Sequence, residues 1–274
     1  MNQHKPKIAL CFSGQLRCHY KLVEHWVQNI IIPLQELYDV ILFFYLGHDN
    51  YFLDTWDIVL ERYKQYDLTI VCQTEIDKDF QDIVPRAFEL TASGLSKGHN
   101  QLIREHYFMD QVINLKQKYE QEHDMLFHYV IRSRPDCLPD KFDIRLLSLA
   151  RNNFCISDHD HHLYINGRFT ICNSAMADKI FTIIDHYNET IDALPAITDR
   201  GGFDPSKKYF GGEYFWLTHL LLFDINIELI PYHVYLVRDY DSTFDEATRG
   251  HIFLNGLSQA RFESYDVTVP INIL

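Results

Sequence analysis

The stretch Lys7-Ile-Ala-Leu-Cys-Phe12, followed directly by Ser13-Gly14, is the clearest indication of the fold class. It is a short apolar run that ends in a turn signal, which is the pattern of a strand buried on both faces of a sheet. A second run of this kind, Asp39-Val-Ile-Leu-Phe-Phe-Tyr-Leu46, follows later. Between them, residues 17–31 have apolar side chains at helical spacing, and Pro33 is expected to interrupt that helix. The chain therefore opens with a strand, a helix and a strand.

The rest of the chain repeats this alternation. We expect helices over residues 56–66, 100–122, 174–191 and 213–222, and strands over residues 68–72 and 126–132, near Phe154 and Phe169, and within residues 225–236. Strands that alternate with helices at this spacing predict an open, mostly parallel α/β sheet flanked by helices. No linker rich in Pro, Gly or Ser divides the chain, so we expect one continuous domain over residues 1–274.

The composition is that of an ordinary globular protein. Hydrophobic residues make up 47% and charged residues 23% of the 274 residues, and a chain of this length can fold without disulfides or a metal. The formal net charge of −13 argues against a nucleic-acid partner, because an acidic surface repels phosphate polymers, but it allows a local basic pocket for one nucleotide. The six cysteines form no C-x-x-C pair and are expected to be buried free thiols.

The sequence gives no sign of a membrane span or a secretion signal. No stretch reaches the roughly 18 uninterrupted apolar residues that a span needs. The N-terminus lacks a basic segment followed by an apolar one and a cleavage site. We therefore expect a cytoplasmic protein, and a peripheral association with a membrane stays open.

Polar side chains follow the ends of the first and fourth predicted strands. In an open α/β sheet, ligands bind beyond the carboxyl ends of the strands. The candidates are Ser13, Gly14, Gln15 and Arg17 after the first strand, and Arg132, Arg134 and Asp136 after the fourth. A Ser-Gly turn can offer backbone N–H groups to a phosphate, and an arginine can add a charge-assisted contact. We expect these residues to bind a nucleotide or its diphosphate, although ordinary caps and turns are the alternative.

The segment Arg132-Ser-Arg-Pro-Asp136 is the most informative. A carboxylate beside arginines suits a diphosphate with a divalent metal: Asp136 would bind Mn²⁺ or Mg²⁺, and an arginine would offset the remaining charge. An internal salt bridge between arginine and Asp136 is the alternative. The Walker loop and the G-x-G-x-x-G pattern are absent from the sequence, so ATP hydrolysis and dinucleotide redox chemistry lack their usual signals.

Five short segments carry a resemblance to a known family: Ile8–Arg17, Tyr129–Asp136, Asn166–Met176, Gly212-Glu213 and Tyr235–Arg238. They resemble GT-A-like glycosyltransferases from bacterial surface-polysaccharide clusters and large viruses. The resemblance implies a GT-A-like (Rossmann-like) domain, with a nucleotide-binding part over about residues 1–140 and an acceptor-side part over about 141–274. It also implies a nucleotide-sugar donor and a metal near Asp136. The family's metal motif is Asp-x-Asp, and Arg134 in place of its first Asp puts metal dependence in question.

We therefore expect an enzyme that moves a sugar from a nucleotide-diphosphate donor to a glycan or lipid-linked acceptor. An inverting enzyme of this kind needs a carboxylate base, for which Glu213, in a Gly-Gly-Glu turn that opens a helix, and Asp204 are the candidates. A first-turn residue favoured by the helix dipole is the alternative for Glu213. Two other functions stay open: another α/β transferase with a nucleotide-bearing donor, such as a sulfotransferase, and a non-catalytic module that binds glycans or nucleotides.

Overall fold

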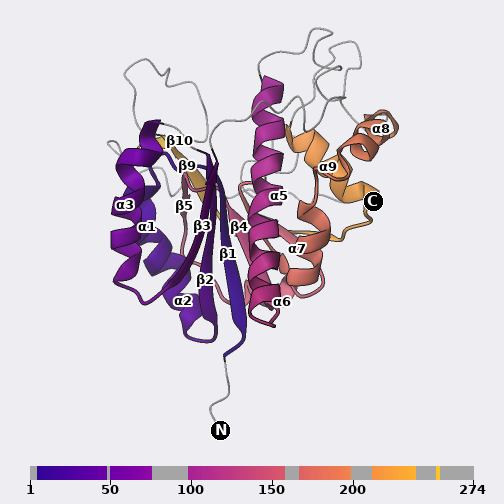
Figure 1. Cartoon of the computed structure of the whole chain (residues 1–274). Coiled ribbons are helices and arrows are strands. Elements are labelled where there is room, and N and C mark those ends of the chain that lie inside the picture. The colour runs from indigo at the N-terminus through magenta and orange to yellow at the C-terminus, as the bar shows by residue number, and fades with distance from the viewer. Residues whose placement is uncertain are drawn as a thin grey trace.

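A seven-stranded sheet lies between two layers of helices (Figure 1). The computed structural model describes residues 5–47, 50–75, 98–157, 167–198, 212–238 and 251–253. The strands of the sheet, in spatial order, are β3 (Thr69–Glu75), β2 (Asp39–Gly47), β1 (Lys7–Gln15), β4 (Tyr129–Ser133), β7 (Phe169–Asn173), β6 (Phe154–Ser157) and β8 (Ile227–Ile230). The β3–β2, β2–β1, β1–β4 and β6–β8 pairs are parallel, whereas β7 is antiparallel to both β4 and β6. The prediction of a mostly parallel α/β sheet flanked by helices is confirmed.

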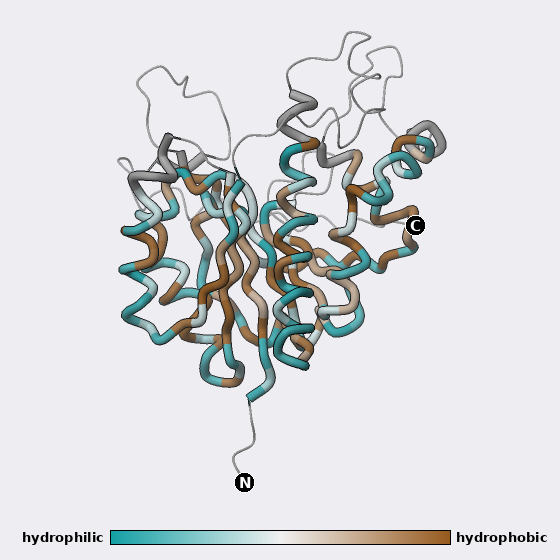
Figure 2. The backbone as a smooth tube through the Cα atoms, in the orientation of Figure 1, coloured by the Kyte–Doolittle hydropathy of each residue, from teal (hydrophilic) through white to brown (hydrophobic). Residues whose placement is uncertain are grey.

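The central strands are buried on both faces, as their continuous apolar sequences predict. Residues Ile8–Phe12 of β1 are all fully buried, and residues 40–46 of β2 are nearly so. Alternate side chains enter separate cores, with Leu10 and Phe12 on one face and Ala9 and Cys11 on the other. Figure 2 shows the hydrophobic colour concentrated along these strands, and hydrophilic colour on the outer sides of the helices.

Each core is closed by its own set of helices. The first core is covered by α1 (His19–Trp26), the π-helical turn η1 (Val27–Ile31), α2 (Ile32–Gln35), α3 (Asn50–Lys64) and the short α6 (Leu146–Leu149). The second core is covered by α5 (Gly98–Glu122), α7 (Ser174–Phe181), α8 (Tyr187–Thr198) and α9 (Gly212–Leu222). None of the described helices has the length and apolar character that a bilayer crossing requires.

Pro33 does not stop the first helix, contrary to the prediction. The chain passes through the π-helical turn and continues in α2, where Pro33 lies in the first turn and needs no helical N–H partner. A carbonyl four residues before a proline loses its usual donor. Here that carbonyl belongs to Asn29, and it accepts from the backbone N–H of Phe142 at 2.9 Å. A tertiary contact thus replaces the helical one.

Three other predictions, two on helices and strands and one on the cysteines, need correction. The apolar run over residues 225–236 forms two strands, β8 and β9 (Val234–Arg238), because Pro231 lies between them. The second of these strands belongs to a separate three-stranded sheet with β5 (Cys137–Pro139) and β10 (His251–Phe253). The helix predicted over residues 174–191 is divided into α7 and α8. All six cysteines are free, but Cys72, on the edge strand β3, is exposed rather than buried.

Candidate functional site

The two predicted binding segments leave the sheet side by side. β2 lies on one side of β1 and β4 lies on the other, so the strand order reverses between β1 and β4. These two strands are parallel and paired as far as Phe12 and Ser133, so their carboxyl ends meet at the same edge. Ligands of open α/β sheets bind at such a reversal point. The sequence prediction and the topology therefore select the same place.

The turn after β1 contains two unusual backbone conformations. Gly14 has a φ of 122°, which residues with a Cβ rarely adopt. Arg17 has a φ of 44°, an uncommon conformation for a residue other than glycine and one that clusters at functional sites. The Arg17 Nε and Nη2 atoms donate to Oε1 of Gln15 at 3.1 and 2.9 Å. Gln15 thus fixes the direction of the Arg17 guanidinium.

Asp136 accepts hydrogen bonds from two arginines. Its Oδ2 accepts from Arg17 Nη1 at 2.6 Å and from Arg134 Nη2 at 2.9 Å, and its Oδ1 accepts from Arg134 Nε at 2.9 Å. The side chain of Asp136 is 2% exposed, whereas those of Arg17 and Arg134 are 31% and 21% exposed. Burial alone would raise the pKa of Asp136, but the two guanidiniums hold it below the ordinary value. The internal salt bridge weighed as the alternative is therefore present.

Arg132 is a buried cation with no carboxylate at hydrogen-bond distance among the described residues. Its Nε and Nη2 atoms donate to Ser13 Oγ at 3.1 and 2.9 Å, and its Nη1 donates to the backbone oxygen of Gly167. Among the described carboxylates, Glu105 is the partner of Arg132, with Oε1 at 4.0 Å from Nη2, beyond hydrogen-bond distance. Burial lowers the pKa of Arg132 to about 10, and Glu105 opposes this shift. Arg132 thus stays charged at neutral pH.

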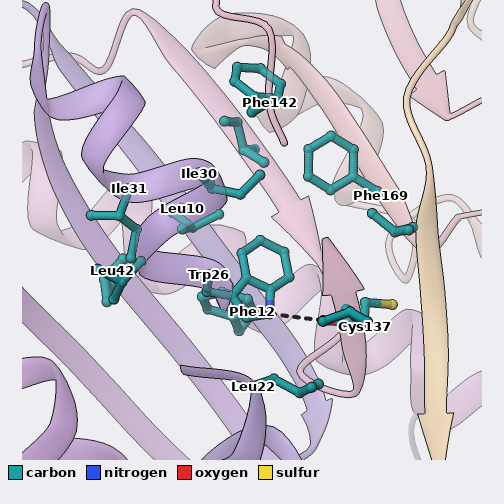
Figure 3. Close-up of a cluster of buried hydrophobic side chains, with 14 of the residues drawn as sticks. Leu10, Phe12, Leu22, Trp26, Ile30, Ile31, Leu42, Cys137, Phe142 and Phe169 are labelled. Atoms are coloured by element: carbon teal, nitrogen blue, oxygen red, sulfur yellow. Dashed lines mark hydrogen bonds between the residues drawn. The ribbon is translucent and has the colours of Figure 1, made fainter. Parts of the chain in front are cut away.

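The backbone of the Arg-Ser-Arg-Pro-Asp segment is fixed from several sides. A carbonyl oxygen can only accept, so His19 Nδ1 donates to that of Pro135 at 2.7 Å, and Nε2 of the neutral ring accepts from the hydroxyl of Tyr63 at 3.0 Å. The N–H of Val237 donates to the backbone oxygen of Asp136 at 2.9 Å. Figure 3 shows the indole of Trp26 donating to the carbonyl oxygen of Cys137, next to the apolar side chains of the first core. Helix α1 and strand β9 therefore hold the segment in position.

Four of the five segments on which the expected resemblance rests converge here. Segments 8–17 and 129–136 meet through the contacts of Arg17 and Arg132. Segment 166–176 contributes the backbone oxygen of Arg168, which accepts from the N–H of Arg134 at 3.2 Å. Segment 235–238 contributes Val237. These segments are far apart in the sequence, so the fold, and not their closeness along the chain, brings them together.

The described side chains do not test the two predicted bases. Glu213 is the second residue of α9, where its backbone is helical. Asp204 lies outside the described residues. Of the charged and polar candidates, the structure thus brings together Ser13, Gln15, Arg17, Arg132, Arg134 and Asp136, with Gly14 forming the turn between them.

Sequence reasoning missed Glu105 and Gly167. Glu105 lies within the long helix α5, and its charge acts on both Arg132 and Arg134. The polar surface of that helix contains many carboxylates and amides, so nothing in the spacing singles out Glu105. Gly167 belongs to a segment that carries the family resemblance, but only the fold shows that its carbonyl oxygen faces Arg132.

The described residues around Asp136 do not fit a divalent metal. Within the described ranges, no group of three or more His, Cys, Asp or Glu side chains could hold a metal ion. Both carboxylate oxygens of Asp136 already accept from guanidinium groups. A cation at Asp136 would have to displace Arg17 or Arg134 and would be repelled by their charges. This donor set suits an anion held by guanidiniums.

Comparisons with known proteins give remote structural likenesses. No protein-family model matches the chain, and no curated protein sequence matches it. The chain is similar to core-mannan synthase A from Aspergillus fumigatus, in its Mn/GDP form, with a TM-score of 0.43, 9% identity, and coverage of 86% of this chain and 77% of that chain. It is similar to a nucleoside-diphosphate-sugar pyrophosphorylase from Vibrio cholerae, with a TM-score of 0.41, 10% identity, and coverage of 81% and 90%. It is also similar to the glycosyltransferase GlyE from Streptococcus pneumoniae, with a TM-score of 0.37, 10% identity, and coverage of 81% of this chain and 45% of that chain. With TM-scores below 0.5, these likenesses decide neither the family nor the activity of this chain.

Proposed function

We propose that the protein is a glycosyltransferase that moves a sugar from a nucleotide-diphosphate donor to a glycan or lipid-linked acceptor. The observation that carries this proposal is the arginine cluster at the ends of β1 and β4. Arg17 and Arg134 share the carboxylate of Asp136, and Arg132 is buried without a carboxylate at hydrogen-bond distance in the described residues. On a protein with a formal net charge of −13, such a cluster is suited to an anionic ligand.

The arginines would stabilise the leaving group. Breaking the bond between sugar and phosphate places negative charge on the departing diphosphate, and fixed positive charges stabilise that change. Arg17 and Arg134 are partly exposed, so their guanidiniums can turn from Asp136 to phosphate oxygens. Arg132 is fully buried, and we assign it a positioning role through Ser13 together with the field of its charge. The backbone of the Gly14 turn would lie against the nucleotide.

A thermal-shift experiment tests the binding part of this proposal. UDP, GDP, CDP and dTDP would be added to the wild type and to Arg134→Gln, each with and without Mn²⁺. We expect one nucleotide to raise the melting temperature of the wild type by mass action, with a much smaller rise in Arg134→Gln. Arg145→Gln is the matched control, because the side chain of Arg145 is 86% exposed in a surface pair with Asp143. Equal shifts of the melting temperature in the wild type and in Arg134→Gln would exclude the arginine cluster as the binding site.

The Mn²⁺ arm of the same experiment tests the cofactor. The geometry around Asp136 leads us to expect the same nucleotide shift with and without the metal. A shift that requires Mn²⁺ would instead favour Asp136 as a metal ligand, the role that the sequence suggests for it, with the cation in the place of Arg17 or Arg134.

The base remains a separate proposal. We propose Glu213 as the group that takes the proton of the acceptor hydroxyl in an inverting reaction, with Asp204 as the second candidate. Glu213→Gln is expected to keep donor binding and to lower the transfer rate, and Asp204→Asn serves as the comparison. Normal transfer in Glu213→Gln with loss in Asp204→Asn would move the role to Asp204. Nucleotide binding with no donor turnover in the wild type would favour a non-catalytic binding module.

A further inference from the structure

Glu105 of α5 is a partly exposed carboxylate beside the arginine cluster. Its side chain is 39% exposed, and its Oε1 lies 4.0 Å from Nη2 of the fully buried Arg132. Among the described residues, no donor forms a hydrogen bond with the Glu105 carboxylate. Asp136 differs, because both of its oxygens accept from guanidinium groups. Glu105 thus places a negative charge at the cluster without being bound to it as Asp136 is.

The charge of Glu105 acts on both arginines of the Arg-Ser-Arg-Pro-Asp segment. Burial lowers the pKa of Arg132, and Glu105 opposes this shift. Burial alone would also lower the pKa of Arg134, but Asp136 and Glu105 hold it above the ordinary value. Arg134 is one of the two proposed ligands of the diphosphate, so the charge of Glu105 also acts on an anion bound there. A negative charge at this place weakens the binding of every anion, and it weakens binding more for the more negative one.

The donor and the product of sugar transfer differ in charge at one phosphate. The terminal phosphate of a free nucleoside diphosphate has a second pKa of about 6, so it carries roughly two negative charges at neutral to basic pH. In a sugar nucleotide the sugar occupies one oxygen of this phosphate, which then carries a single charge. Transfer of the sugar therefore leaves a more negative molecule in the site. A fixed carboxylate nearby raises the free energy of the product complex more than that of the donor complex.

We propose that Glu105 makes the site prefer a sugar nucleotide over the free nucleoside diphosphate. This inference rests on the proposed glycosyltransferase function. Arg17 and Arg134 hold both molecules by direct contact, whereas Glu105, an ionised carboxylate that cannot donate a hydrogen bond to phosphate, weakens the hold on the more negative one. The diphosphate then leaves more readily after transfer, and product release is the slow step of many enzymes.

Calorimetric titration with a matched pair of ligands tests this on the full chain at about pH 8. The ligands are UDP and its β-methyl ester, or GDP and its β-methyl ester if guanosine is the nucleoside that binds. The ester has the charge of a sugar nucleotide and lacks the sugar hydroxyls, so a change in the affinity ratio between wild type and variant reports the charge. Glu105→Gln is expected to tighten diphosphate binding about fivefold more than ester binding, as for one partly exposed charge.

Two further variants control for effects other than the charge at this place. Glu122→Gln makes the same substitution on the same helix, about 25 Å farther along it. Glu122 is 56% exposed in a pair with Lys118, and a charge at that distance is screened by salt. It is expected to leave the affinity ratio unchanged. Glu105→Asp retains the charge and is expected to keep the wild-type ratio within about twofold.

The outcomes separate this inference from the proposed function. An equal change in affinity for the diphosphate and the ester in Glu105→Gln would overturn the inference. Glu105 would then be a counter-charge of Arg132 alone, and the diphosphate site would stand. Glutamine is a good helix former, so Glu105→Gln should fold, and its melting temperature checks this. Failure of UDP, GDP, CDP and dTDP to bind the wild type would refute the proposed function, and the selection by Glu105 with it.

Discussion

Replacing Asp136 by asparagine separates the roles open to this carboxylate. Asp136→Asn keeps the shape of the side chain and removes its charge, so Arg17 and Arg134 lose the carboxylate that they share at 2.6–2.9 Å. If the carboxylate occupies the position that a diphosphate takes, the substitution weakens the fold and strengthens nucleotide binding. If the carboxylate is a metal ligand, nucleotide binding is lost.

The expected loss of stability follows from burial. Removing one partner of a buried ion pair costs about 3–5 kcal/mol, and asparagine retains a neutral acceptor, so we expect about 3 kcal/mol. For a large domain this lowers the melting temperature by roughly 6–12 °C. In Asp136→Asn, a nucleoside diphosphate no longer competes with a carboxylate for the two guanidiniums. A gain of about 1.4 kcal/mol in the free energy of binding would then tighten nucleotide binding about tenfold.

The assay is calorimetric titration of UDP or GDP, with melting curves, on the wild type and on Asp136→Asn. Asp143→Asn is the control, because that carboxylate pairs with Arg145 on the surface and should matter by less than about 1 kcal/mol. An unchanged melting temperature in Asp136→Asn would show that the ion pairs are not formed. The opposite result would be weaker nucleotide binding in Asp136→Asn, together with binding by the wild type only when Mn²⁺ is present. That result would contradict the expected competition and show that Asp136 is a metal ligand.

Further predictions concern stability and pH. Lys116 is fully buried and pairs with Glu120 at 2.9 Å and Asp178 at 2.5 Å. Lys116→Met should therefore lower the free energy of unfolding, measured in urea, by about 3–5 kcal/mol. Lys118→Met is the control and should be nearly neutral, because Lys118 lies in an exposed pair with Glu122 at 3.9 Å. Burial lowers the pKa of His19 to about 4, against 6.5 in the unfolded chain, so the unfolded chain binds more protons between these values. The His19 contribution to stability is therefore complete above pH 6.5 and is lost as the pH falls to about 4, by about 3 kcal/mol, and urea unfolding of His19→Gln should show a weaker pH dependence over that range.

The sheet could be predicted because its strands are local features. The apolar runs at residues 7–12 and 39–46 are buried on both faces in the structure, and each lies within the strand observed there. The rule that ligands bind at carboxyl strand ends then placed Arg17 and Asp136 together, although 119 residues separate them in the sequence.

The remaining features depend on contacts between distant segments. Pro33 reads as a helix stop because the sequence does not show that Phe142 supplies the missing N–H to Asn29. The small sheet of β5, β9 and β10 pairs residue 137 with residue 236, and short strands carry little pattern of their own. The saturation of Asp136 by two arginines needs the geometry of a turn in which Arg17 has a positive φ.

A crystal structure with bound UDP-glucose or GDP-mannose would show whether the arginines at the ends of β1 and β4 hold the diphosphate. We expect the diphosphate at the carboxyl ends of β1 and β4, with phosphate oxygens within hydrogen-bond distance of Arg17 and Arg134 and at least one of these guanidiniums turned away from Asp136. A ligand bound elsewhere, with both arginines still paired to Asp136 as described, would contradict it.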